Sequence, residues 1–504
     1  MILLWLILIP FIGGLLCWLT GNMGLKVPRV IALLSTLLLL VLSIWLWWTG
    51  TYSFTDPTHV PVWSDQFQLD WIPRFGISIH LALDGFGLLM VVLTGVVGLL
   101  SVVCAWHDLE GRNGAFYFNL LLLLTTVVGI FLAVDLFLFF FFWEVMLIPM
   151  YFLISLWGFK GSDRQSNTRA AVKFFIYTQS SGLLMLLAII GLVFVHYSQT
   201  GVITFDYDLL LGTHVGGAFG MVLMLGFFIA FAVKLPVVPF HGWMPDAHAH
   251  GPSAGSLDLA GIMIKTAGFG LLRFALPLFP EQSALFAPVA MVLGLISIYY
   301  GAVMAFAQKD IKRLLAYSTI SHMGFVLIAI YSGSTLALQG SVVLMIASAL
   351  SGSALFIISG GLYNRLKTRD MSQMGGLFGR VGALSGFSLA FAMASLGIPG
   401  TANFIGEFLI LFGAFGAWPW VVVLASIGLV LASVYALTIL HRIYYGAPKI
   451  EGTFAGLSVR ETFMLGLALV LLLFVGFYPQ LVLNASLQPM TEIAQWFSVP
   501  TLLQ

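Results

Sequence analysis

Long apolar runs separated by short polar loops occupy most of this 504-residue chain. A helix that crosses a bilayer needs about 20 mostly apolar residues, and by that measure the pattern predicts about fourteen membrane spans. The predicted spans cover residues 2–20, 28–49, 77–106, 113–133, 134–158, 170–197, 217–245, 254–277, 285–307, 313–332, 335–363, 381–416, 418–441 and 461–479. The expected fold class is therefore an all-α polytopic membrane protein.

Composition strengthens this assignment. The chain is 60% hydrophobic and 8% charged, with a mean hydropathy of +1.04, whereas a soluble domain is about 25% charged. The first run, MILLWLILIPFIGGLLCWLT, lacks a basic leader, so we expect it to be retained as the first span rather than cleaved. Cys17 and Cys104 are too few to hold a four-cysteine iron–sulfur cluster.

The basic residues of the loops predict the orientation of the chain. If the N-terminus lies outside, the odd-numbered loops face the cytoplasm, where Lys and Arg are enriched. The even-numbered loops hold only Arg74 of the 21 basic residues. The odd-numbered loops hold Lys26, Arg29, Arg112, Lys160, Arg164, Arg169, Lys173, Lys309, Lys312, Arg313, Arg365, Lys367, Arg369, Arg380, Arg442, Lys449 and Arg460. This asymmetry supports both the number of spans and an outside N-terminus.

Two predicted spans are interrupted beside an ionisable residue. The seventh reads FAVKLPVVPFHGWMP, and the twelfth reads LGIPGTANFIGEFLIL. Proline removes a backbone hydrogen bond and opens a helix. Five spans separate the two breaks, so they have opposite orientations, as in an inverted repeat with broken helices at its centre. A simple kink in each span is the alternative.

We therefore expect two inverted five-helix repeats, formed by spans four to eight and nine to thirteen. The predicted domain organisation is N-terminal helices one to three in 1–112, a first repeat in 113–277, a second repeat in 285–441, and a C-terminal helix and tail in 461–504.

Five ionisable side chains fall deep within the predicted spans: Glu144, Lys234, Lys265, His322 and Glu407. A charge at mid-bilayer costs about 2.5–3.5 kcal/mol, and intramembrane ionisable residues commonly mark ion pathways. Bridged by water, the five could carry a proton across the fold. Movement of Glu144 relative to Lys234 would switch the lysine between its charged and neutral forms.

Structural roles remain open for several of these groups. Glu144 and Lys234 could form one static ion pair that fixes helix register, and His322 could be a hydrogen-bonded core histidine. A third basic residue within the spans, Arg273, lies near a helix end and is expected to extend to the interface.

The remaining polar candidates carry weaker signals. Asp84, Asp135 and Asp258 could cap helices or order water. The segment HGWMPDAHAHGPSAGS contains three histidines and an aspartate, but it has no established metal-ligand spacing, so a proton entry region or an interfacial turn is favoured over a metal site. Its members are His241, Asp246, His248 and His250. No nucleotide-binding glycine loop or catalytic serine motif is evident.

Four motifs carry a family likeness: FFFFWEVMLIPMYFLISLWG, FAVKLPVVPFHGWMPDAH, KDIKRLLAYSTISHMGF and GIPGTANFIGEFLILFG. They resemble the M-type antiporter-like subunits of bacterial respiratory complex I, the proton-translocating NADH:quinone oxidoreductase. The likeness extends from LIPFIGGLLCW to the last span. Glu407 favours the M type, because the related L and N subunits are expected to carry lysine there.

The resemblance implies a fourteen-helix antiporter-like fold that pumps protons within the membrane arm of the complex. It implies an ion pair between Glu144 and Lys234, a bridging Lys265, a central His322 and an exit-side Glu407. It also implies no redox centre in this chain, because NADH, FMN, iron–sulfur clusters and quinone would bind partner subunits.

The expected partners are the other membrane-arm subunits, including L and N, together with lipid and protons but no nucleic acid. The expected location is the bacterial inner membrane. Two alternatives stay open: a subunit of an Mrp-type Na⁺/H⁺ antiporter, and a passive scaffold. One position departs from the family pattern, since Ser348 in MIASALSGSALF replaces an expected histidine. This change leaves the path between His322 and Glu407 in doubt.

Overall fold

The computed structural model describes residues 1–24, 26–50, 52, 63–106, 114–159, 164–450, 452 and 454–496. Thirteen segments within these ranges are long and apolar enough to cross a membrane. Two shorter apolar helices, α17 (Leu384–Ser395) and α18 (Ala402–Phe415), occupy the predicted twelfth span. The all-α polytopic class is therefore confirmed. Arg112, Lys160 and the tail 497–504, which entered the predictions above, lie outside the described residues.

The first half of the chain runs from the N-terminal helices to the broken helices around Lys234 and Lys265. Its N-terminal elements are α1 (Ile2–Leu19), α2 (Lys26–Thr49), β1 (Asp65–Ile72), β2 (Ile77–Leu83) and α3 (Gly85–Cys104). They are followed by α4 (Gly114–Leu132), α5 (Leu136–Val145), α6 (Leu147–Trp157), α7 (Arg164–Thr200), α8 (Tyr207–Leu210) and α9 (Gly217–Lys234). The half ends with α10 (Met244–His250), α11 (Ser253–Asp258), the π-turn η4 (Leu259–Met263), α12 (Lys265–Gly270), the π-turn η5 (Leu271–Ala275) and α13 (Leu276–Leu278).

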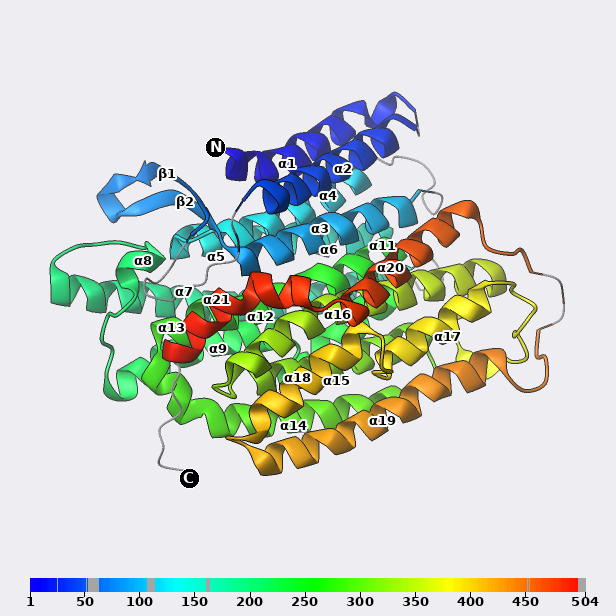
Figure 1. Cartoon of the computed structure of the whole chain (residues 1–504). Helices are drawn as coiled ribbons and strands as arrows, with labels where there is room; N and C mark the ends of the chain where they lie inside the picture. Colours follow the sequence, from blue (N-terminus) through cyan, green and yellow to red (C-terminus); the bar gives the residue numbers. More distant parts are fainter. Residues whose placement is uncertain are drawn as a thin grey trace.

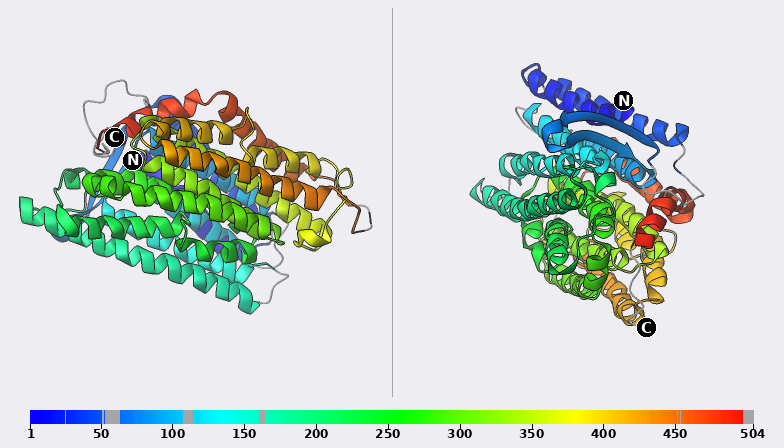
Figure 2. Two further views of the ribbon diagram at one scale, coloured as in Figure 1. Left: turned by 90° about the horizontal axis from the view of Figure 1, so that it is seen from below. Right: turned by 90° about the vertical axis from the view of Figure 1, so that its left-hand side faces the viewer.

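The second half consists of longer helices. It contains α14 (Pro280–Ala307), α15 (Ile311–Ile330), α16 (Thr335–Leu366), α17, α18, α19 (Pro419–Tyr444), α20 (Val459–Phe477) and α21 (Gln480–Trp496). The helices run roughly side by side, with α1 and α2 along one edge of the bundle and α14 and α19 along the opposite edge (Figures 1 and 2). The almost wholly buried α16 packs against α15, α18, α20 and α21, so it forms the centre of this half.

One predicted boundary was wrong, and one helix was missed. The third span was predicted to begin at residue 77, but Ile77–Leu83 is a strand that pairs antiparallel with β1, and the helix begins only at Gly85. The carboxylate of Asp84 accepts the Gly87 backbone N–H and starts the helix there. The second helix at the C-terminal end, α21, was not predicted at all.

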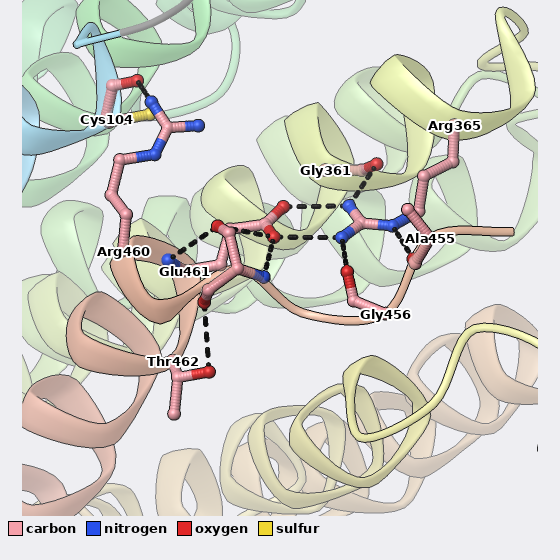
Figure 3. A network of polar contacts seen from close by, with 9 residues as sticks. Cys104, Gly361, Arg365, Ala455, Gly456, Arg460, Glu461 and Thr462 are labelled. Carbon is pink, nitrogen blue, oxygen red and sulfur yellow. Dashed lines mark hydrogen bonds and ion pairs between the residues drawn. The ribbon is translucent and has the colours of Figure 1, made fainter.

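A polar network joins the end of α16 to the start of α20 (Figure 3). The guanidinium of Arg365 donates to both carboxylate oxygens of Glu461, at 2.8 and 2.9 Å, and to three backbone carbonyls of Gly361, Ala455 and Gly456. Glu461 also forms a capping box with Ser458 at the first turn of α20. Since a bidentate, charge-assisted pair has one well-defined geometry, it fixes the start of α20 against the end of α16.

Candidate functional site

The five predicted site residues lie on five different helices, and all except His322 are close to a helix break. Lys234 is the last residue of α9, and Lys265 is the first residue of α12, separated from the π-helical segment η4 by Ile264 alone. Glu144 lies on α5, one residue before that helix ends, His322 on α15, and Glu407 on α18 after the break that separates it from α17. Lys234, Lys265, His322 and Glu407 are exposed by 6% or less. The carboxylate oxygens of Glu144 are also buried.

The structure does not join Glu144 to Lys234 by a hydrogen bond or an ion pair. Within the described chain, the two carboxylate oxygens of Glu144 have no hydrogen-bond partner. The ammonium group of Lys234 has none either. The Lys234 Nζ instead lies 3.6 Å from the centre of the Trp143 ring. Trp143 precedes Glu144 on α5, so ring and carboxylate extend from one turn of helix near the same ammonium. Sequence reasoning missed this contact, although the residue lies within the motif that carried the prediction.

A glycine of the neighbouring helix makes room for the Glu144 carboxylate. A Cβ placed on Gly182 of α7 would lie 1.9 Å from Oε1 of Glu144, which is far inside van der Waals contact. The acid is therefore packed directly against backbone. Its position depends on the absence of a side chain at residue 182.

The hydrogen-bond partner of Lys265 lies in the π-helical segment η4 that precedes it. The Lys265 Nζ donates to the carbonyl oxygen of Ala260 at 2.5 Å. Such a turn interrupts the regular i to i−4 ladder, and π-turns occur often at functional sites. The ammonium is thus held by a backbone dipole, with no ion pair among the residues that the structure describes.

The second half brings its two predicted residues together directly. The His322 Nδ1 lies 3.3 Å from Oε1 of Glu407, and the Tyr435 hydroxyl lies 3.2 Å from the other ring nitrogen of His322. Gly397, with φ of +78°, gives space to the Glu407 carboxylate, because a Cβ there would lie 2.4 Å from Oε2. The Ser348 hydroxyl donates to the Met345 carbonyl of its own helix. The His322–Glu407 contact therefore does not depend on a side chain at residue 348.

The weaker acidic candidates have structural partners. Asp135 accepts the backbone N–H groups of Phe137 and Leu138 and so caps α5, as predicted. Asp84 caps α3 and also pairs with Arg273.

The expectation that Arg273 extends to the interface was wrong. Its side chain is 7% exposed, and its guanidinium pairs with the Asp84 carboxylate. A buried partner outweighs the gain from reaching water, because breaking such a pair would leave two uncompensated charges. The buried Asp258 accepts a hydrogen bond from the Ser101 hydroxyl.

In the histidine-rich segment, the aspartate is engaged in ion pairs with basic residues rather than with the neighbouring histidines. Asp246 receives hydrogen bonds from Lys173 at 2.7 Å and from Arg313 at 2.6 Å. Burial opposes its charged form, but these two cations outweigh burial and hold the pKa of Asp246 below its usual range. Asp246 thereby connects the turn to α7 and α15.

A second polar cluster, missed by sequence reasoning, lies at the hairpin end of the bundle. His80, Asp206 and Asp208 bring potential metal ligands within 4.8 Å of one another. The His80 Nδ1 lies 2.6 Å from the Asp206 carboxylate, which is hydrogen-bond distance, so an ion bound between them would have to separate the pair. Burial disfavours the imidazolium, but the adjacent carboxylates of Asp206, Asp208 and Asp135 outweigh it and raise the pKa of His80.

Comparison with known proteins identifies the family. The family model for the membrane subunits of "NADH:quinone oxidoreductase/Mrp antiporter" matches residues 133–432. NADH-quinone oxidoreductase subunit M of Escherichia coli is 59% identical over 500 residues, covering 99% of this chain and 98% of that protein. Subunit M of Pseudomonas aeruginosa is 59% identical over 499 residues, covering 98% of each chain.

Solved structures agree with this assignment. A chain of respiratory complex I from Thermus thermophilus with bound NADH superposes with a TM-score of 0.86 at 30% identity, covering 99% of this chain and 100% of that chain. A chain of the Mrp complex from Dietzia sp. has a TM-score of 0.82 at 23% identity, covering 98% of this chain and 52% of that chain, and so shares the fold alone. These likenesses confirm the resemblance predicted from the motifs and favour the oxidoreductase over the Mrp antiporter. The chain belongs to the subunit M family of the membrane-embedded NADH-quinone oxidoreductases.

Proposed function

We propose that this chain moves protons across the membrane along Glu144, Lys234, Lys265, His322 and Glu407, driven by quinone reduction elsewhere in an NADH:quinone oxidoreductase. The observation that carries the proposal is the set of five buried ionisable groups, four of them near helix breaks, which ends in the direct contact of His322 with Glu407 at 3.3 Å. Charges this deep in an apolar protein are costly and commonly serve ion pathways.

The free energies involved are of matching size. Two unit charges 4 Å apart interact by about 4 kcal/mol at an effective dielectric constant of 20. Moving one charge through 100 mV of membrane potential is worth about 2.3 kcal/mol. Closing and opening the Glu144–Lys234 pair can therefore bias Lys234 between its charged and neutral forms by enough to drive one proton against the field.

A proton leaving Lys234 would pass through Lys265 to His322 and then to Glu407. Histidine suits the central position because its ring accepts a proton at one nitrogen and releases one at the other. The Tyr435 hydroxyl and the Glu407 carboxylate lie at these two nitrogens. Water must bridge the longer gaps between the lysines and the histidine.

We infer the wider context from the family. The chain would adjoin the other membrane-arm subunits, including L and N, in a bacterial inner membrane with its N-terminus outside. NADH, FMN, iron–sulfur clusters and quinone would bind in partner subunits. The two inverted repeats would cover residues 113–277 and 285–441, which places the Glu144–Lys234 half and the His322–Glu407 half in separate repeats.

The test is neutralisation of the first pair in the assembled complex. We expect Glu144→Gln and Lys234→Ala each to abolish NADH:quinone turnover coupled to proton pumping. NADH oxidation by an artificial acceptor, which reports the amount of assembled enzyme, should remain. Lys26→Ala, which removes an exposed lysine at the start of α2, is the matched control. Full pumping in either pair variant would refute the proposed path and leave the chain a passive scaffold.

A further inference from the structure

Among the described residues, the Lys234 ammonium lies over one aromatic ring, that of Trp143. The Nζ is 3.6 Å from the ring centre, well within the limit of about 6 Å for a cation–π contact. Trp143 is fully buried and Lys234 is 1% exposed. The contact is therefore desolvated, the condition under which a cation gains most from an aromatic face.

Neighbouring aromatic rings hold Trp143 in this orientation. Phe231, one turn before Lys234 on α9, packs edge-on against Trp143 with ring centres 5.3 Å apart, and Phe139 packs one turn earlier on α5 at 5.7 Å. The end of α9 is fixed as well, because the Trp243 indole N–H donates to the Val233 carbonyl at 2.8 Å. Both the ring and the helix that carries the lysine are thus constrained.

Adjacency along α5 gives the ammonium two alternative positions. The ring of Trp143 and the carboxylate of Glu144 belong to consecutive residues. The lysine has a flexible four-carbon side chain, so its ammonium can move between the two. In the position observed, the ammonium contacts the ring and forms no hydrogen bond with the acid. A charged lysine without its acid would otherwise have no favourable contact in this apolar region.

We propose that Trp143 is a positioning residue that stabilises the Lys234 ammonium when the lysine is separated from Glu144, and so controls how readily that pair opens. The inference rests on the proposed function, because only a pair that opens and closes during pumping needs a second position. Trp143 transfers no proton itself.

Substitutions in the assembled complex test this role. We expect Trp143→Leu, which keeps an apolar side chain but removes the ring face, to lower coupled turnover about thirtyfold, the size expected for one desolvated cation–π contact. Trp143→Phe retains a weaker face and should lower turnover only two- to threefold. Phe116→Leu is the matched control, because it removes a fully buried ring of α4 that packs on Tyr117 and Trp157 rather than on Trp143.

Fluorinated tryptophan incorporated at residue 143 provides a readout that packing alone would not change. Fluorine on the ring reduces the negative potential of its face while leaving its shape nearly the same. We expect coupled turnover to fall stepwise with each added fluorine. This series also decides the matter if Trp143→Leu fails to assemble.

The outcomes separate the two proposals. Equal effects of Trp143→Leu and Phe116→Leu, or turnover indifferent to fluorination, would overturn the role of Trp143 while Lys234→Ala remained inactive. Full pumping by Lys234→Ala would instead overturn the proposed function itself. A graded series of Trp, Phe and Leu, with a fluorination dependence, supports the inference.

Discussion

Replacing Gly182 by alanine is a sharp test of the packing around Glu144. A Cβ at residue 182 would lie 1.9 Å from the Glu144 Oε1, whereas ordinary contact begins near 3.4 Å. The carboxylate must therefore move by about 1.5 Å, since α7 is continuous at this point. A displacement of about 1 Å at a reacting group can cost about a hundredfold in rate.

Gly182→Ala is expected to favour the helix but to lower activity. Glycine inside a helix is about 0.8–1.0 kcal/mol less favourable than alanine, so helix propensity favours the Gly182→Ala variant. We expect a complex of near-normal abundance and thermal stability whose coupled NADH:quinone turnover falls between tenfold and a hundredfold. The measurements are turnover and pumping per enzyme, with artificial-acceptor activity as the count of assembled complexes.

Two further variants decide whether Glu144 is the cause. Gly466→Ala on α20 is the matched control, because nothing lies within 4 Å of its added Cβ. Glu144→Asp shortens the side chain by about 1.5 Å, one carbon–carbon bond. In the Gly182→Ala background it should restore part of the lost turnover, a non-additivity expected only for residues in contact. Normal turnover in the single Gly182→Ala variant would refute the reasoning.

Three other predictions follow from the described contacts. Ser348→Ala should change coupled pumping by less than twofold, because the hydroxyl is hydrogen-bonded within its own helix and His322 reaches Glu407 directly; a collapse of pumping would show that the hydroxyl itself is needed. Asp84→Asn should destabilise the subunit by about 3–5 kcal/mol, measured by thermal unfolding or assembly yield, because it leaves a buried arginine charge uncompensated; unchanged stability would contradict the buried pair. Asp206→Asn should lower the unfolding temperature more at pH 6 than at pH 8. The raised pKa of His80 adds stability below the ordinary histidine value, and this stability is lost as pH rises through the folded value. A loss that is equal at both pH values would show that the carboxylate does not act through the histidine.

Features that depend on local composition could be predicted from the sequence. Apolar run length predicted the spans, and the prolines after Lys234 and before Glu407 predicted the two broken helices. The ionisable site residues were recognisable because a charge within an apolar run is costly wherever it lies. None of these inferences requires knowledge of which helices touch.

The hairpin was missed for a local reason. Residues 77–83, ISIHLAL, are apolar enough to extend a predicted span, but they alternate with period two and are followed by Asp84 and Gly85, a helix start signal. The later helix α21 was missed because polar residues recur along its sequence, QLVLNASLQPMTEIAQW, so that no long apolar run marks it.

Contacts between helices could not be predicted at all. The position of Trp143 under Lys234, of Gly182 against Glu144, and of Arg273 beside Asp84 joins residues 38 to 189 positions apart, and spacing says nothing about such pairs. The resemblance implied an ion pair between Glu144 and Lys234, yet the lysine lies on the adjacent ring. Whether the ammonium of Lys234 contacts Trp143 or the adjacent Glu144 decides whether the Glu144–Lys234 pair is open or closed.

The two halves of the chain are in opposite states in this conformation. In the first half, acid and base are apart, with Lys234 on an aromatic face and the Glu144 oxygens without a hydrogen bond among the described residues. In the second half, His322 and Glu407 are paired. Each acid lies against a glycine, Gly182 or Gly397, so backbone rather than a flexible side chain limits its movement. Under the proposed function, we expect the bases to be the partners that move, because a glycine backbone blocks each acid on one side. Lysine, with its long stem, and histidine, with two nitrogens, are suited to that role, so we expect Trp143 and Tyr435, the contacts of the bases, to be the positions where coupling can be adjusted without removing a charge.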